Sequence, residues 1–240
     1  MNLKPEGAEF EFETQAVRLF RNLEFEILSG KLPPGTRLVR RELTQRFHLS
    51  QATVSEALWR LETDGLAESA PMYGTRVTRV TPQRLTDESI LREALECQVA
   101  RIVSRKIKAS DLPRLEALAD RVDALLRKAG TYSRADMEVH QEFHLAVARL
   151  SESRLLIREV ERLWRRHFMF FTWVSGKLWP SPAHWHRKLL DALMSGDPDK
   201  AERTTRDHVR YGAKHQQELL DKAAAIEVVD KRDRRPARKA

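Results

Sequence analysis

Strand-like patterning in this 240-residue chain is confined to one short stretch, residues 66–80. Within it, the segments 66–70 and 75–80 flank the turn sequence Pro71-Met72-Tyr73-Gly74, which favours a hairpin. Elsewhere apolar residues recur at helical spacing. The chain holds only 9 Gly and 10 Pro, which argues against a turn-rich all-β sandwich or barrel. The sequence therefore predicts a mostly α protein with one small β-hairpin.

The residues before the hairpin predict a helix-turn-helix. A short helix fits residues 40–47, and Ser50 is a good N-cap for a second helix that runs through Thr63. Gly65 suits the left-handed position that follows a helix. Helix, turn, helix and hairpin in this order form a winged helix-turn-helix, so we predict a DNA-binding domain over residues 1–80.

The N-terminal part of the second helix is expected to enter the major groove. Gln51 can pair with adenine there, and small polar neighbours allow a close approach of the backbone. Arginines before this helix and on the wing can contact phosphates, while the wing tip faces the minor groove. A helical packing module with a solvated charged face is the alternative interpretation. The predicted DNA contacts are Arg40, Arg41, Gln51, Ala52, Thr53, Ser55, Tyr73, Gly74 and Arg76.

From residue 87 onward the pattern is helical throughout. Thr81-Pro82 marks a break, so we assign residues 81–86 to a linker and 87–222 to an antiparallel bundle of helices. This all-helical domain is predicted to bind an effector and to form the dimer contact. The basic, apolar-poor end, residues 223–240, is predicted to be disordered.

Composition limits the class of protein further. The net charge of +8 favours polyanionic partners, but the first 80 residues hold 11 basic and 11 acidic side chains, so charge alone does not locate a nucleic-acid site. A single cysteine, Cys97, excludes a disulfide framework. The longest apolar run, Phe168 to Val174, is far shorter than the roughly 20 residues of a membrane span, and the start of the chain is acidic. We therefore expect a cytoplasmic protein.

Four of the eight histidines can converge on one site. His140 and His144 lie four residues apart on one predicted helix, hence on one face. His186 and His208 lie equally far from Asp197, in the turn between two helices, so an antiparallel hairpin brings them to the same level. Two such pairs inside a bundle can hold a cation, although a His pair at this spacing is also common on a solvated surface. Solvated or hydrogen-bonded surface positions are assigned to His48, His167, His184 and His215.

The N-terminal residues resemble the GntR family of transcription regulators. The resemblance runs from Ile27 to Leu38, through 41–66, and into the wing at 73–77. Family members commonly carry Ser-Arg-Thr-Pro-Val-Arg-Glu-Ala-Leu at the recognition helix, where this chain has Ser-Gln-Ala-Thr-Val-Ser-Glu-Ala-Leu. Gln51 and Ser55 thus replace two arginines that contact bases or phosphates. The resemblance implies DNA binding, but not the usual operator of the family.

The helical half resembles the FCD effector domain of FadR-type GntR regulators. The motifs are Leu91–Glu96, Phe143–Ala148, His186–Leu193, Gly196-Asp197, Ala201 and His208. Many members bind a divalent metal through one Asp and three His, which correspond here to His144, His186 and His208. This chain has His140 where the family has the Asp, and Asp136, one turn earlier, is the alternative fourth ligand.

A four-imidazole site would differ chemically from that pattern. It favours zinc, nickel or copper over magnesium or manganese, with zinc as our first choice and nickel as the second. Neutral imidazoles leave the +2 charge of the metal uncompensated, so the site should attract an anion. The resemblance implies a small carboxylate effector, and we predict that Arg92 and Arg101 pair with it. Solvated side chains, or salt bridges to Glu96 and Glu93, are an equally good interpretation of these arginines.

Together these features predict a homodimeric transcription regulator rather than an enzyme. It would bind a pseudo-palindromic DNA operator and respond to a carboxylate effector at a metal site in the helical domain. One alternative is a metal-free regulator with an apolar pocket for an acyl ligand. Another is a His-ligated metal enzyme, for which only Glu142 lies close in sequence as an acid or base, on another helix face.

Overall fold

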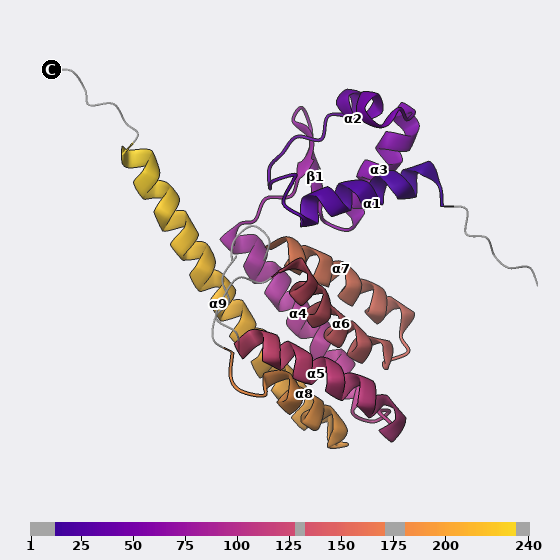
Figure 1. Ribbon diagram of the computed structural model, residues 1–240, viewed down its shortest axis with the longest axis vertical. Coiled ribbons are helices and arrows are strands. Elements are labelled where there is room, and N and C mark those ends of the chain that lie inside the picture. The colour runs from indigo at the N-terminus through magenta and orange to yellow at the C-terminus, as the bar shows by residue number, and fades with distance from the viewer. Residues whose placement is uncertain (1–12, 128–132, 171–180, 234–240) are drawn as a thin grey trace, which may run out of the picture. The chain divides into compact units, whose positions relative to one another are not determined.

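The protein divides into two compact units. The structure, a computed structural model, describes residues 13–127, 133–170 and 181–233 (Figure 1). One unit comprises the described residues up to Ile27 together with Lys31–Thr78. The other comprises Leu28–Gly30 and the described residues from Arg79 onward.

The N-terminal unit is a winged helix-turn-helix, as predicted. Its elements are α1 (Gln15–Leu28), α2 (Arg40–Phe47), α3 (Gln51–Thr63), β1 (Ala67–Ala70) and β2 (Gly74–Val77). The Ser50 hydroxyl caps α3 by accepting a hydrogen bond from the Thr53 backbone N at 3.1 Å. The two strands are antiparallel, with Ala67 opposite Val77, and β2 is shorter than the predicted segment 75–80.

A feature that the sequence did not predict holds the hairpin in place. Residues 35–38 run along the free edge of β2, where the backbone N of Leu38 donates to Thr75 O at 2.9 Å. The backbone N of Val77 donates to Thr36 O at 2.8 Å. These bonds satisfy backbone groups that a two-stranded ribbon would leave open, so the wing is tied to the segment that leads into α2.

The second unit is all-helical, as predicted. Its elements are α4 (Pro82–Val103), the 3₁₀ turn η1 (Ala109–Asp111), α5 (Leu112–Arg127), α6 (Arg134–Arg149), α7 (Arg154–Phe170), α8 (Trp185–Met194) and α9 (Pro198–Asp233). In the described residues, no helix is long and apolar enough to cross a membrane.

Two boundaries in this unit differ from the sequence-based assignment. The predicted linker 81–86 is the start of α4, because the Thr81 hydroxyl caps the backbone N of Arg84 and Pro82 takes the first helical position. The predicted disordered end is helical as far as Asp233, and residues 234–240 lie outside the described residues. Of the helix predicted over 153–175, the part beyond Phe170 also lies outside them.

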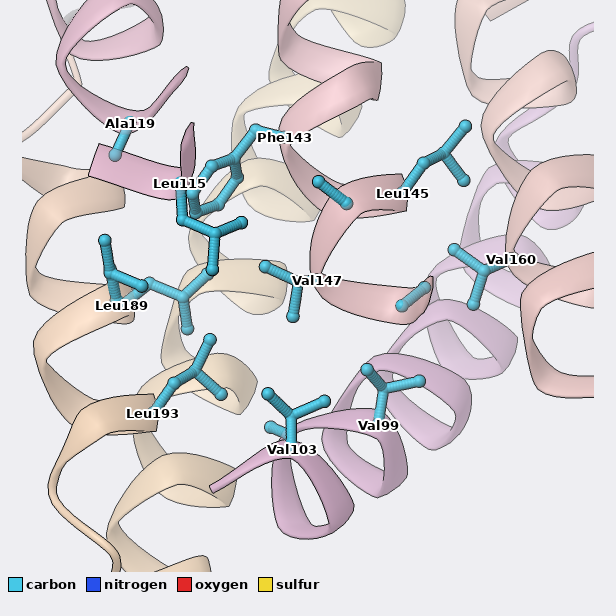
Figure 2. Close-up of a cluster of buried hydrophobic side chains, with 14 of the residues drawn as sticks. Val99, Val103, Leu115, Ala119, Phe143, Leu145, Val147, Val160, Leu189 and Leu193 are labelled. Carbon is cyan, nitrogen blue, oxygen red and sulfur yellow. The ribbon is translucent and has the colours of Figure 1, made fainter. Parts of the chain in front are cut away.

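Helix α6 lies at the centre of the bundle. Apolar side chains from α4, α5, α6, α7 and α8 meet in one buried cluster (Figure 2). Phe143 and Val147 point from α6 toward Leu115 of α5 and Leu189 of α8. Residues 143–148 of α6 are all buried, so a polar residue in this part of the helix must find its partners inside the protein.

Candidate functional site

The four predicted histidines converge inside the bundle. His140 and His144 come from α6, His186 from α8 and His208 from α9. Each offers a ring nitrogen, and these four atoms all lie within 4.8 Å of one another. The side chains are buried, so the solvated-surface interpretation of the His140/His144 pair is wrong.

The helix geometry explains the convergence. The imidazole rings of His186 and His208 have centroids 4.7 Å apart, as expected for positions equidistant from the turn of an antiparallel hairpin. The rings of His140 and His144, one turn apart on α6, have centroids 5.2 Å apart. Asp136, the alternative fourth ligand, is instead part of the N-terminal capping box of α6, where its carboxylate bonds to Ser133.

Asp123 on α5 fixes the orientation of His186. The Nδ1 atom of His186 lies 2.9 Å from Asp123 Oδ1, which also accepts the backbone N–H of His186 at 2.9 Å. A carboxylate at Nδ1 places the ring proton there and leaves the lone pair on Nε2. The Nε2 atom points into the cluster, 3.0 Å from His140 Nε2.

Glu96 on α4 has the same role for His144. Its Oε2 lies 3.3 Å from His144 Nδ1, while its Oε1 accepts hydrogen bonds from Arg92 Nε at 2.9 Å and from Trp164 Nε1 at 3.0 Å. With Nδ1 occupied, His144 Nε2 is buried and has no hydrogen-bond partner among the described residues. The same holds for Nδ1 of His208.

Burial keeps the four imidazoles neutral. It lowers the pKa of His140 and of His208 well below the ordinary value, and neighbouring imidazoles lower both further. Burial also lowers the pKa of His186, against the opposing effect of Asp123. For His144 it lowers the pKa to about 4, although Glu96 opposes the shift. Neutral imidazoles with free lone pairs are the form that binds metals.

The carboxylates stay ionised in spite of their burial. Desolvation alone would raise the pKa of Glu96, but Arg92 and His144 outweigh it and hold that pKa well below its ordinary value. Hydrogen bonds from His186 likewise outweigh the burial of Asp123 and lower its pKa. The two carboxylates and the Arg92 guanidinium give the surroundings of the cluster a formal charge of −1. A bound divalent cation would therefore leave the site at +1, not at the +2 expected from the sequence.

These residues fit a divalent transition metal. Tetrahedral zinc lies about 2.1 Å from its imidazole nitrogens and so holds them roughly 3.4 Å apart. The four atoms of the present cluster, all within 4.8 Å of one another, are spread somewhat wider and need only move closer around an ion. Two buried ring nitrogens, of His144 and His208, have lone pairs or protons that no other described residue satisfies. Such groups are costly unless they bind something.

A cavity of about 30 Å³ lies beside the cluster. Its lining includes the three histidines His140, His186 and His208, together with Arg92, His167, Gln216, Trp185 and Tyr211. Arg92 is buried, with its guanidinium 4.6 Å from the centre of the Trp164 ring. The Arg92 cation and the Gln216 amide in its wall give this small cavity polar groups that can pair with an anion.

Only one of the two predicted effector arginines, Arg92, borders the cavity. Arg92 is salt-bridged to Glu96, as the alternative interpretation has it, and its effector contact stays a prediction. Arg101 does not line the cavity; its guanidinium pairs at 2.5 Å with Asp199 and with Glu202. Its predicted effector contact stays an untested prediction.

Four residues of the site were not assigned to it from the sequence. Asp123 and Glu96 hold two of the imidazoles, and His167 and Gln216 line the cavity, where the Gln216 amide N lies 3.0 Å from His167 Nε2. The surface position predicted for His167 is wrong, because this histidine is buried and hydrogen-bonded. No spacing rule could have found these residues, because their partners lie on other helices.

The predicted DNA contacts form part of the surface of the N-terminal unit. Gln51 and Ala52 are exposed at the start of α3, and Ser55 is half-buried one turn later. The Thr53 hydroxyl lies 2.8 Å from that of Ser50, so it also belongs to the helix cap. Arg40 and Arg41 are exposed at the start of α2. On the wing, Tyr73 and Gly74 are exposed, and Arg76 lies 3.6 Å from Glu68.

Two known families match the chain in succession. Residues 15–77 match the bacterial regulatory proteins of the gntR family, and residues 90–211 match the FCD domain. The HTH-type transcriptional repressor RspR of Escherichia coli (strain K12) is 28% identical over 200 residues, covering 80% of this chain and 85% of that protein. A probable D-xylose utilization operon transcriptional repressor of Paenarthrobacter nicotinovorans is 29% identical over 186 residues, covering 77% and 80%.

Solved structures share the fold. McbR/YncC of E. coli superimposes with a TM-score of 0.67 at 21% identity, covering 86% of this chain and 99% of that one. A transcriptional regulator of Rhodococcus sp. RHA1, described as GntR, superimposes with a TM-score of 0.62 at 21% identity, covering 84% and 97%.

Proposed function

Because the chain belongs to the gntR family of bacterial regulatory proteins and carries an FCD domain, we propose that it is a regulator whose DNA binding responds to a small carboxylate held at a metal site. The family makes it a DNA-binding transcriptional regulator and not an enzyme. The metal, the effector and the dimer are our proposal.

The observation that supports the metal site most directly is the histidine cluster with its two carboxylates. We propose that His140, His144, His186 and His208 bind one divalent ion, with zinc preferred over nickel. Asp123 and Glu96 orient two of these rings, an arrangement common behind metal-binding histidines. The metal would offer positive charge to an anion in the adjoining cavity.

The effector is proposed to be a small carboxylate. Its negative charge would bind the metal, and Arg92, which also lines the cavity, would contact its second oxygen or a second polar group. For this ligand to regulate, it must bind the DNA-competent and DNA-incompetent states with different affinity. A homodimer would place two winged helices on two half-sites of a pseudo-palindromic operator.

Metal analysis of the purified protein tests this proposal. We expect one zinc ion per chain by native mass spectrometry, and none in the His144→Ala/His208→Ala double variant. That variant should also lose any response to a panel of small hydroxy- and keto-carboxylates while it keeps basal DNA binding. His48→Asn removes an exposed histidine of the other unit and should change neither property. Full metal content in the double variant would show that the histidines are structural, and would favour the metal-free regulator.

A second test concerns DNA reading by α3. Gln51 is exposed at the N-terminus of this helix, so its amide can reach a base edge. Replacing it with Ala should weaken binding to the operator by about 1–3 kcal/mol and binding to random DNA very little. Gln83→Ala, an exposed glutamine in the other unit, is the control in the same fluorescence-anisotropy titration. An equal loss on both DNAs would show that Gln51 does not read sequence.

A further inference from the structure

The tip of the wing contains a methionine in an unusual backbone conformation. The backbone N of Tyr73 donates to Ala70 O at 3.1 Å, which closes a four-residue turn with Pro71 second and Met72 third. The φ angle of Met72 is 67°. Proline second and a positive φ third are the pattern of a type II turn, where glycine is the usual third residue. A side chain at this position is sterically disfavoured.

The fold gives no reason for this side chain. Met72 is 99% exposed, so it adds nothing to the core. Three other non-glycine residues have a positive φ in the described residues, and each has a local role. His48 and His184 occupy helix caps, and Glu152 pairs with Lys106. The strained backbone at Met72 contributes nothing to folding, which indicates a function outside the fold.

The neighbours of Met72 indicate what it contacts. Tyr73 is 68% exposed beside it, and the guanidinium of Arg76 lies 6.0 Å from the centre of the Tyr73 ring. The tip is therefore an apolar projection followed by a cation on β2. A minor groove offers a matching surface, because sugar and base edges line it and phosphates border it. Methionine is one of the residues that proteins insert between base steps from this groove.

We propose that Met72 enters the minor groove of the operator and packs against one base step, so that this side chain selects the sequence there. Steps that unstack easily, such as TA and CA/TG, should be preferred. G·C pairs should be disfavoured, because the guanine 2-amino group projects into the minor groove where the side chain would lie. This contact is separate from the major-groove reading by α3 and goes beyond DNA binding as such.

Binding measurements with full-length variants test this contact. The probe is a duplex that the wild-type protein selects from a random pool, compared with a random-sequence duplex of equal length. Met72→Gly should bind the selected duplex roughly tenfold more weakly and the random duplex equally well, whereas Met72→Leu should retain affinity within about twofold. Met194→Ala, which removes an exposed methionine of the other unit, is the control. The melting temperature of Met72→Gly should be no lower than that of the wild type, because glycine tolerates the positive φ.

Inosine identifies the groove. Placing G·C at the preferred step should weaken wild-type binding, and I·C at the same step should restore it, because I·C lacks the minor-groove amino group but keeps the major-groove edge of G·C. The Met72→Gly variant should not distinguish the two duplexes. Unchanged affinity of Met72→Gly for the selected duplex would overturn the proposal, as would an equal loss on both duplexes. A lower melting temperature would overturn the strain argument on which it rests.

Discussion

Asp123 illustrates how one buried side chain determines what a histidine can do. Its carboxylate accepts the ring Nδ1–H and the backbone N–H of His186, and the backbone N–H of Arg187 at 3.2 Å. With both oxygens engaged, the carboxylate cannot turn, and neither can the imidazole. The His186 ring therefore presents Nε2 to the cluster before any ligand arrives, which reduces the entropy lost on binding.

Removing the charge of Asp123 should loosen this arrangement. In Asp123→Asn the amide group would meet the backbone N–H of Arg187 with a donor instead of an acceptor, or rotate and lose the contact to His186. We expect zinc affinity to fall by about 10- to 100-fold, measured by competition with a chromophoric chelator. Asp120→Asn, on the same helix but exposed, is the matched control and should bind zinc like the wild type. A similar loss in both variants would indicate a general electrostatic effect.

For single residues, the sequence predicts the candidate metal-binding histidines better than the carboxylates that orient them. The four histidines could be found because two are one helical turn apart and two are symmetric about Asp197. Asp123 could not be found, because it lies 63 residues from His186 and meets it only when α5 packs against α8. The charge of the site was misjudged for the same reason.

A helix end was predictable where the capping residue has no proline beside it that could also indicate a break. Ser50 begins α3 as expected, and its hydroxyl accepts the Thr53 backbone N–H. Thr81-Pro82 was interpreted as a break, yet a threonine before a proline is equally a good helix start, since proline needs no hydrogen-bond acceptor in the first turn. The pattern of residues 82–86 alone could not distinguish the two, because only Leu85 among them is buried.

The cap of α3 makes a measurable contribution to the stability of the N-terminal unit. Ser50→Ala removes the acceptor for the Thr53 N–H and should lower the free energy of unfolding by about 1 kcal/mol, whereas Ser50→Gly should cost only a few tenths. Urea unfolding of the two variants and the wild type measures this difference. Ser50 is exposed, so no core contact is lost in either variant. Equal losses would mean that the hydroxyl does not act as a cap.

For the whole molecule, the two compact units should respond differently to acid. The unfolded chain protonates its histidines near pH 6.5, but folded His144 resists protonation down to its pKa of about 4, and folded His140, His186 and His208 also have lowered pKa values. Between these limits the unfolded state binds more protons, so stability is lost as pH falls from 6.5 toward 4. His144 alone should account for about 3 kcal/mol in the metal-free protein.

Differential scanning calorimetry of the metal-free protein checks this expectation. The transition of the α4–α9 unit should move to lower temperature from pH 7 to pH 5, and that of the winged helix-turn-helix much less. Added zinc at pH 7 should raise only the first transition, because a ligand stabilises the unit that binds it. In the His144→Ala/His208→Ala variant the acid-dependent shift should shrink. A shift of equal size in that variant would assign the acid sensitivity to other groups.

Glu96 is shared among three neighbours, the Nδ1 atom of His144, the guanidinium of Arg92 and the indole N–H of Trp164. An anion that draws Arg92 away would leave more of the carboxylate's charge for the imidazole, which would then be a stronger donor to the metal. Binding free energies are reciprocal, so a metal held more tightly in the presence of the anion must also tighten the anion. The proposed regulator would then work as an AND gate, in which the metal supply of the cell sets the carboxylate concentration that the protein can detect.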